Sequence, residues 1–362
     1  MRKSHLWSIA ALALALLVAI SLLALAGCKS SQQADTAQSE PAGPIAPPPI
    51  INPLTGKTVA SADIIRRRPL AVKVENDPAA RPQSGLPGAD IVYEEMVEGG
   101  VTRFIALFMS QDVSAIGPCR SARPSDIDIA FFHLPLLACS GGAPGMMKQI
   151  QQAGMLGLEE DGAHFWRDKS RKAPHNLYTS TDRLRAALAS WQDDYNQLPA
   201  SSLAFMSEQE AAAAVAASTS GSAEGQTGTA ASSVDIAYGN GCDVHYDYAK
   251  AGDGYLRTVN GHPSTDLTTG AQVQPTNFIV QYVEVVPSGL KDVLGADSPD
   301  SVVIGTGRAV IFSGGQIINA TWSKASRNSP TVYKDSSGSV VQLHPGQTWI
   351  NLIPDRIALT YE

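Results

Sequence analysis

Short runs of apolar side chains, separated by polar turns, predict most elements in the first half of the chain. The run LAVKVE at residues 70–75 alternates apolar and polar positions, as a strand does. Residues 89–97 and 101–110 are rich in β-branched and aromatic side chains, and Glu98-Gly99-Gly100 separates them. We therefore expect two further strands, paired as a hairpin across that turn.

Helical patterns alternate with strands over residues 124–191. Pro124 is typical of a first helical turn, so PSDIDIAFFH predicts a short helix. The continuous apolar run LPLLACS predicts a buried strand. MMKQIQQAGM predicts a second helix, and STDRLRAALASW, with its Ser and Thr caps, predicts a third. Strands interleaved with helices indicate an α/β domain.

From residue 234 onward the pattern changes to short β-rich runs separated by Gly, Asp, Asn or Pro. Examples are NFIVQYVEVV, SVVIGTGRAVIF, GQIINATW and QTWINLIP, and no helical pattern accompanies them. Such runs are typical of an all-β domain, a sandwich or a barrel. The predicted fold is therefore an α/β domain with a mixed sheet at residues 61–206, a low-complexity insertion at 207–233 and an all-β domain at 234–362.

The first 27 residues have the pattern of an export signal, a basic start followed by a long apolar run without charge. That run could also be an uncleaved membrane anchor. Its end, Leu25-Ala26-Gly27-Cys28, resembles a bacterial lipobox, which implies cleavage before Cys28 and attachment of acyl chains, palmitate among them. Residues 28–60 are rich in Ser, Gln, Ala and Pro, which predicts a disordered tether. We expect an extracytoplasmic protein, lipid-anchored to the bacterial cell membrane.

Charge and cysteine spacing exclude several classes of function. The net charge of −7 at pH 7 argues against a nucleic-acid partner, which needs a basic face. The sequence contains no CxxC and no HExxH motif, and its histidines are scattered. We therefore expect neither a metal site nor a cofactor.

A loop and a turn could form an anion pocket. If the strands ending near residues 110 and 139 are parallel neighbours, the loop carrying Arg120 and Arg123 meets the turn Ser140-Gly141-Gly142 at one sheet edge. Guanidinium groups suit carboxylate or phosphate, and a glycine-rich turn before a helix suits an anion.

The same arginines could instead be structural. In that interpretation they pair with neighbouring acids and pin the long loop. The acids considered for this role are Glu94, Glu95, Asp126 and Asp128.

Cys119 and Cys139 would lie at the same edge, so we expect a disulfide between them in an exported protein. Two buried free thiols are the alternative. His175, in the run KAPHN, could act as a general base with an acid such as Glu95, or could belong to a rigid turn. Glu94 and Glu95 could equally lie on a solvated strand face.

Several motifs, in order, resemble the YerB-like bacterial lipoproteins. AVKVEND, VYEEMVEGGVTRFIALF, IGPCRSARPSD and APHNLYTS resemble the N-terminal domain of that family. GYLRTVNGHPSTDLTTG, NFIVQY, ATWSK and PGQTWINLIP resemble its C-terminal domain. The resemblance implies a surface lipoprotein of two domains and supplies no catalytic residues. The chain departs from the family pattern at Cys119 and at Cys139-Ser140-Gly141-Gly142, which counts against a general catalytic role for either cysteine.

Three functions stay open. We favour a non-enzymatic binding or envelope-associated module, whose pocket takes an anionic envelope-derived ligand. The second is a cell-envelope hydrolase that uses His175 and a carboxylate. The third is a scaffold that docks another protein through the β domain.

Overall fold

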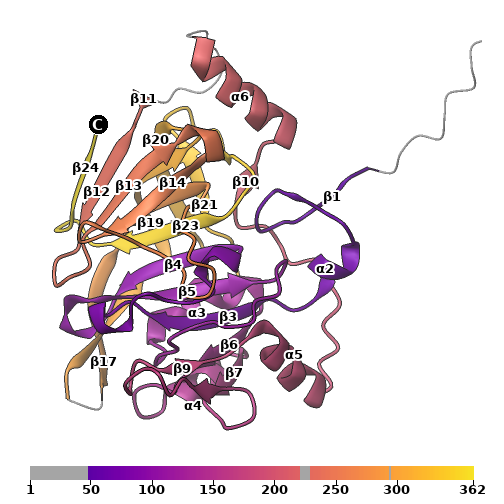
Figure 1. The fold of residues 1–362 in the computed structure, drawn as a ribbon, viewed down its shortest axis with the longest axis vertical. Coiled ribbons are helices and arrows are strands. Elements are labelled where there is room, and N and C mark those ends of the chain that lie inside the picture. The colour runs from indigo at the N-terminus through magenta and orange to yellow at the C-terminus, as the bar shows by residue number, and fades with distance from the viewer. Residues whose placement is uncertain (1–47, 221–228, 293–294) are drawn as a thin grey trace, which may run out of the picture. The chain divides into compact units, whose positions relative to one another are not determined.

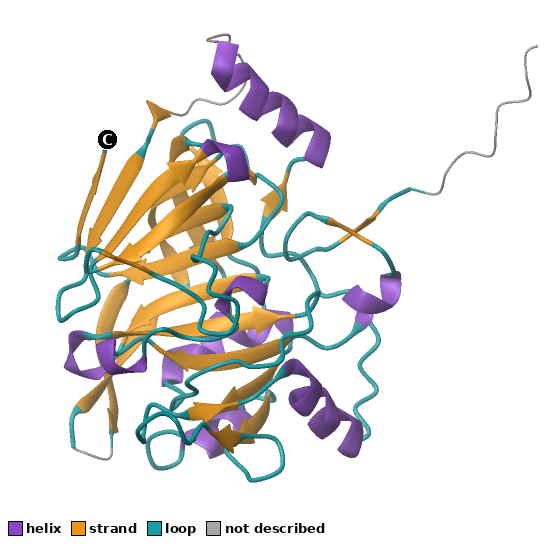
Figure 2. Ribbon diagram, viewed as in Figure 1, coloured by secondary structure: helices purple, strands orange, loops and turns teal. Residues whose placement is uncertain are grey.

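The computed structural model describes residues 48–220, 229–292 and 295–362 and, of residues 218–220, only the backbone (Figure 1). The signal sequence, Cys28 and most of the tether lie outside these ranges. Strands dominate the described chain (Figure 2). None of its helices is long and apolar enough to cross a membrane.

One large sheet runs through both halves of the chain, in the strand order β11-β20-β19-β16-β23-β4-β5-β3-β6-β7, with β21 paired to β20. Its N-terminal strands are β3 (Leu70–Glu75), β4 (Ile91–Met96), β5 (Thr102–Phe108), β6 (Leu136–Cys139) and β7 (Leu156–Glu159). Its C-terminal strands are β11 (Thr229–Ala230), β16 (Asn277–Tyr282), β19 (Gly305–Ser313), β20 (Gln316–Lys324), β21 (Val332–Asp335) and β23 (Thr348–Ile353). The parallel pair β23–β4 joins the two halves.

A second, five-stranded sheet packs on one face of the C-terminal half. Its order is β15-β14-β13-β12-β24. The strands are β12 (Ser233–Ala237), β13 (Val244–Ala249), β14 (Gly254–Val259), β15 (His262–Pro263) and β24 (Ala358–Tyr361). Tyr246 of this sheet stacks on Phe278 of the large one, with ring centroids 4.2 Å apart. The C-terminal half is therefore a β-sandwich, one of the two all-β architectures expected from its short β-rich runs.

Helices cover both faces of the N-terminal half. α5 (Thr181–Ser190) packs on the face that carries Val72 and Phe104, whereas α2 (Ala62–Arg66), α3 (Pro124–Ala130) and α4 (Met146–Gln152) contribute to the opposite face. The three helices expected between residues 124 and 191 are thus confirmed, and so is the hairpin of β4 and β5, which pairs Met96 with Thr102. Because both faces are covered, every residue of β4 is buried, including Glu94 and Glu95. The alternative of a solvated strand face is therefore wrong.

Shorter elements complete the described chain. Two-stranded pairs are β1 (Ile50–Ile51) with β2 (Thr58–Val59), β8 (Trp166–Arg167) with β9 (Leu177–Tyr178), β10 (Ala204–Phe205) with β22 (Gln342–Leu343), and β17 (Glu284–Lys291) with β18 (Asp297–Val302). The 3-10 turns are Pro78–Ala80, Leu86–Gly88, Glu98–Gly100, Phe131–His133 and Lys250–Gly252.

Two segments differ from the predicted organisation. Residues 50–59, assigned to the tether, form β1 and β2, and Leu54 between them is fully buried. In the low-complexity stretch, α6 (Glu208–Ser220) is helical over 13 residues. Neither segment has the alternation that marks a core element. Residues 50–59 are ordered because Leu54 packs in the core, and α6 forms because its alanine-rich run has a high helix propensity.

Candidate functional site

The loop that carries Arg120 and Arg123 inserts between the carboxyl ends of β3 and β6. On one side, the amide of Arg120 donates to the carbonyl of Lys73 (2.9 Å). On the other, the amide of Ser140 donates to the carbonyl of Arg120 (3.0 Å), and the amide of Ala122 donates to that of Gly141 (2.8 Å). The loop therefore continues the sheet where β3 and β6 separate.

This route corrects the expected topology. The strands ending near residues 110 and 139 are β5 and β6, and β3 lies between them. β5 is antiparallel to β3, whereas β6 is parallel to it. β5 therefore ends where β3 and β6 begin. The long loop after β5 returns to the other end of these strands, where it brings the arginines to the glycine-rich turn.

Arg123 is a structural residue in this arrangement. Its Nε lies 2.9 Å from Oε2 of Glu98, its Nη2 contacts the same oxygen, and its Nη1 donates to the carbonyls of Ser121 and Ala122. The Arg123 and Glu98 side chains are only 5% and 8% exposed. All three guanidinium nitrogens are therefore already bonded, and the loop is pinned to the β4–β5 turn.

Arg120 keeps free hydrogen-bond donors. Its Nε donates to Oε1 of Glu75 (2.6 Å), while its two Nη groups have no hydrogen-bond partner among the described residues. The other oxygen of Glu75, Oε2, lies 3.0 Å from Nδ1 of His175. The acids that pair with Arg120 and Arg123 are therefore Glu75 and Glu98. None of the four acids expected for this role forms an ion pair with either arginine in the described chain.

Arg103, which is not among the residues predicted for the pocket, contributes a third guanidinium. It stands on β5, opposite Glu75 on β3 and Glu95 on β4, yet it forms no ion pair in the described chain because both acids are bonded elsewhere. Its Nη1 donates to the carbonyl of Ser121 (3.0 Å), and Nε and Nη2 are accessible without a described partner. Burial, and then the charges of Arg123 and Arg120, lower the pKa of Arg103 to about 10.

These arginines face one cavity of about 430 Å³. The described residues that line it are Glu75, Asp77, Glu98, Gly99, Val101, Thr102, Arg103, Arg120, Ser121, Arg123, Gly142, Ala143, Asp292 and Ala296. Ser140 and Gly141 do not line it. They hold the arginine loop through their backbones instead, and α4, which follows the turn, has only seven residues.

A buried charge cluster lies on the same face of the sheet. Nζ of Lys73 contacts Glu95 and lies 2.6 Å from Oδ1 of Asp126, and Ser125 donates to Oε2 of Glu95 (2.6 Å). Burial, reinforced by Glu95 and opposed by Lys73, raises the pKa of Asp126 to about 7. Burial acts the same way on Glu95, but Lys73 and the hydrogen bonds to Glu95 outweigh it and lower that pKa. Glu95 is therefore committed to this cluster.

His175 does not meet Glu95. Its acidic neighbour is Glu75, which also binds Arg120, and the backbone amide of His175 closes a turn on the carbonyl of Lys172 (2.9 Å). The pairing of His175 with Glu95 was thus wrong. The turn alternative agrees with these contacts.

Cys119 and Cys139 are free thiols, so the expected disulfide is not formed. Cys119 packs in the core on the Val74 face of the sheet, and Cys139 packs in the core on the opposite face. Side chains on opposite faces cannot bridge without moving the backbone. Burial raises the pKa of both thiols, that of Cys139 to about 12, which makes either a poor nucleophile.

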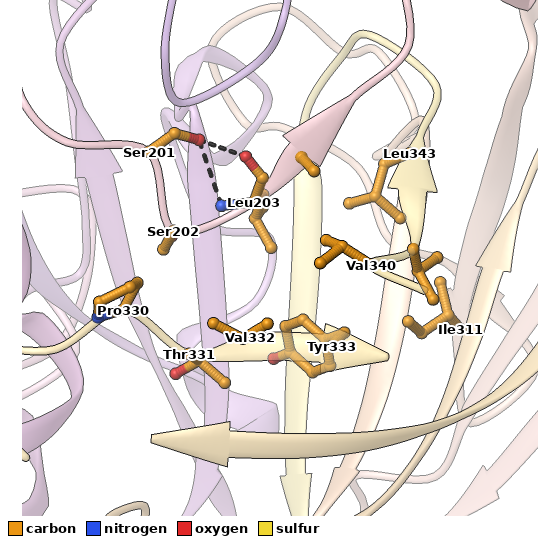
Figure 3. Close-up of a pocket in the computed structure, with 12 residues that line it drawn as sticks. Ser201, Ser202, Leu203, Ile311, Pro330, Thr331, Val332, Tyr333, Val340 and Leu343 are labelled. Atoms are coloured by element: carbon orange, nitrogen blue, oxygen red, sulfur yellow. Dashed lines mark hydrogen bonds between the residues drawn. The ribbon is translucent and has the colours of Figure 1, made fainter. Parts of the chain in front are cut away.

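A second cavity, of about 200 Å³, lies in the C-terminal half (Figure 3). Most of its lining is apolar, with hydroxyl groups from Ser201, Ser202, Thr331 and Tyr333, and none of the described lining residues is charged. It therefore offers no positive charge to pair with an anion. Within the described ranges, no group of His, Cys, Asp and Glu side chains could hold a metal ion.

The chain belongs to a family of unknown function. The profile "Protein of unknown function (DUF3048) N-terminal domain" matches residues 54–194, and the matching C-terminal domain profile covers residues 234–350. These two matches correspond to the α/β part and the β part.

One relative, compared both by sequence and by its crystal structure, places the chain more closely. The chain is 33% identical over 311 residues to "Putative lipoprotein YerB" of Bacillus subtilis (strain 168), across 84% of this chain and 86% of that protein. The crystal structure of the YerB protein from Bacillus subtilis superimposes with a TM-score of 0.72 at 31% identity, across 86% of this chain and 99% of that one. The expected YerB-like resemblance is therefore confirmed.

Proposed function

We propose that this protein is a lipoprotein held at the outer side of the cell membrane through Cys28, and that its N-terminal domain binds an anionic group of a small ligand. The lipobox pattern at Leu25-Ala26-Gly27-Cys28 and the name of the Bacillus subtilis relative support the anchor. The binding proposal rests on one observation, the free guanidinium donors of Arg103 and Arg120 in a single cavity.

Charge-assisted hydrogen bonds make this arrangement suited to a carboxylate or phosphate. Two partly desolvated guanidinium groups repel each other, and an anion between them would relieve that repulsion while supplying acceptors for their N–H groups. A cavity of about 430 Å³ is within the roughly 300–1,000 Å³ typical of small-molecule sites. Binding therefore needs no rearrangement of the sheet.

An enzymatic role has weaker support. His175 and Glu75 form an oriented pair, but the thiols are buried and no hydroxyl lies within hydrogen-bond distance of the imidazole in the described chain. General-base catalysis needs a group or a water to activate at that distance. We therefore favour binding over hydrolysis.

Calorimetric titration tests the pocket. Full-length protein in an uncharged detergent is titrated with inorganic phosphate and with N-acetylalanine, alongside Arg103→Gln, Arg120→Gln and the control Arg308→Gln. Arg308 is an exposed arginine that does not line the cavity. We expect the first two variants to lose binding at least tenfold and to melt like the parent.

The contrasting variant is Arg123→Gln, which we expect to lower the melting temperature because Glu98 is left buried without its partner. Binding of neither probe, or equal binding by parent, Arg103→Gln and Arg120→Gln, would reject the anion pocket. The anchor is tested separately. A Cys28→Ala chain should fail to incorporate radiolabelled palmitate, and unchanged labelling would exclude Cys28 as the modified residue.

A further inference from the structure

The cavity carries free groups of both signs. Arg103 and Arg120 present the unpaired donors, and Asp77 presents an unpaired acceptor. Oδ1 of Asp77 accepts the amide of Ala79 (2.8 Å), while its Oδ2 has no hydrogen-bond partner in the described chain. The remaining acids of the lining are already occupied, since Glu75 and Glu98 pair with arginines and Asp292 has more than one contact, the amide of Ala296 among them.

We infer that the ligand is a zwitterion of the amino-acid class, a free amino acid or short peptide whose amino group is unblocked and protonated and whose carboxylate is bound by Arg103 and Arg120. In this arrangement the ammonium group of the ligand lies against Asp77. The inference rests on the proposed anion pocket and names the class of ligand for it.

Charge complementarity separates this ligand class from simple polyanions. Four carboxylates line the cavity beside three arginines, so a pyrophosphate or tricarboxylate would bring several negative charges next to Asp77, Glu75 and Glu98. A zwitterion brings one negative group to the free guanidinium donors and one positive group to the free carboxylate oxygen. The acidic lining then acts as a source of specificity against polyanions.

Matched dipeptides test the inference. Full-length protein is titrated at pH 6.5 with alanylalanine, N-acetyl-alanylalanine, alanylalanine amide and inorganic phosphate. At this pH an α-amino group, with an ordinary pKa near 7.7–8.0, is protonated. We expect alanylalanine to bind about tenfold or more tightly than either blocked form, because each blocked form lacks one charge-assisted contact.

The decisive variant is Asp77→Asn, which retains a side-chain oxygen to accept the amide of Ala79 and so keeps the turn. We expect it to bind alanylalanine and the N-acetyl form equally, whereas the control Asp355→Asn, at an exposed site away from the cavity, should behave like the parent. Arg103→Gln should lose all three carboxylate or phosphate probes.

The outcomes distinguish the two proposals. If the N-acetyl form binds the parent as tightly as alanylalanine and Asp77→Asn changes nothing, the zwitterion inference is overturned while the anion pocket stands. If no probe binds the parent, both proposals are overturned. A preference for alanylalanine that disappears in Asp77→Asn supports both.

Discussion

Arg257 offers the sharpest test of how the two halves of the chain are held together. It stands on β14 of the second sheet and is 1% exposed, and its Nη2 lies 3.0 Å and 3.3 Å from the two carboxylate oxygens of Glu94 on β4. Its guanidinium carbon lies 5.0 Å from the ring centre of Trp349. The perturbation is Arg257→Met, which keeps an apolar stem against the tryptophan and removes the charge.

The magnitude follows from what remains around Glu94. In the variant this carboxylate stays fully buried, and its remaining donors among the described residues are the hydroxyl of Thr102 (2.7 Å) and the amide nitrogen of Asn76 (3.2 Å). Breaking a buried ion pair by removing one partner costs about 3–5 kcal/mol. The two surviving hydrogen bonds are neutral and offset only part of the lost charge, so we expect the free energy of unfolding to fall by about 3 kcal/mol or more.

Urea unfolding, followed by tryptophan fluorescence and far-ultraviolet circular dichroism, measures this loss. For a slope of about 3 kcal/mol per molar urea, the midpoint should move down by about 1–1.5 M. The two signals should still coincide, because the β23–β4 pair makes both halves one sheet. The control is Lys291→Met, which removes an exposed ion pair with Asp297 and should change stability by less than about 1 kcal/mol.

A loss below about 1 kcal/mol in Arg257→Met would refute the reasoning, and so would two separate transitions in the parent. The double variant Arg257→Met with Glu94→Gln gives an independent check. Because no unpaired charge is then left in the core, it should be more stable than Arg257→Met alone.

Three further predictions concern the core. The pKa of Asp126 is about 7 in the folded protein, against about 3.9 in the unfolded chain. Between pH 5 and 7 the native state therefore binds a proton that the unfolded state has released, so the free energy of unfolding should fall as pH rises through that window. Asp126→Asn should flatten the pH profile measured by urea unfolding, and an unchanged slope would contradict this. Leu54→Ala should cost about 2–5 kcal/mol, since Leu54 is fully buried, whereas a residue of a disordered tether would show no effect on the same midpoint. Cys119 and Cys139 should resist alkylation in the native protein and should react after unfolding without a reductant. If alkylation of the unfolded chain required a reductant, the two cysteines would be joined in a disulfide and this prediction would be wrong.

The candidate site was only partly predictable. The sequence pointed to Arg120, Arg123 and Gly142, which do line the cavity, because an arginine-rich loop and a glycine turn are local signals. It could not separate the roles of the two arginines, since the distinction depends on which acids reach them. Arg103 was not predicted as a pocket residue, because the sequence of a charged hairpin does not show which acids its arginine will meet. Its availability results from Glu75 and Glu95 both bonding elsewhere.

What the sequence determined by itself is local. Side-chain periodicity, turn residues and caps decided the β4–β5 hairpin, the helices α3, α4 and α5 and the β-rich C-terminal half, because each depends on neighbours within about ten residues. Motif order decided the family.

Only the tertiary structure decided which strands are neighbours. A strand's alternation shows that one face is buried but not which strand pairs with it, so the position of β3 between β5 and β6 could not be derived from the pattern. That position sends the arginine loop across the sheet and places Cys119 and Cys139 on opposite faces. Another long-range pairing, between β23 and β4, joins the two domains expected from the sequence into one sheet. Backbone hydrogen bonds between strands do not require the strands to be close in sequence.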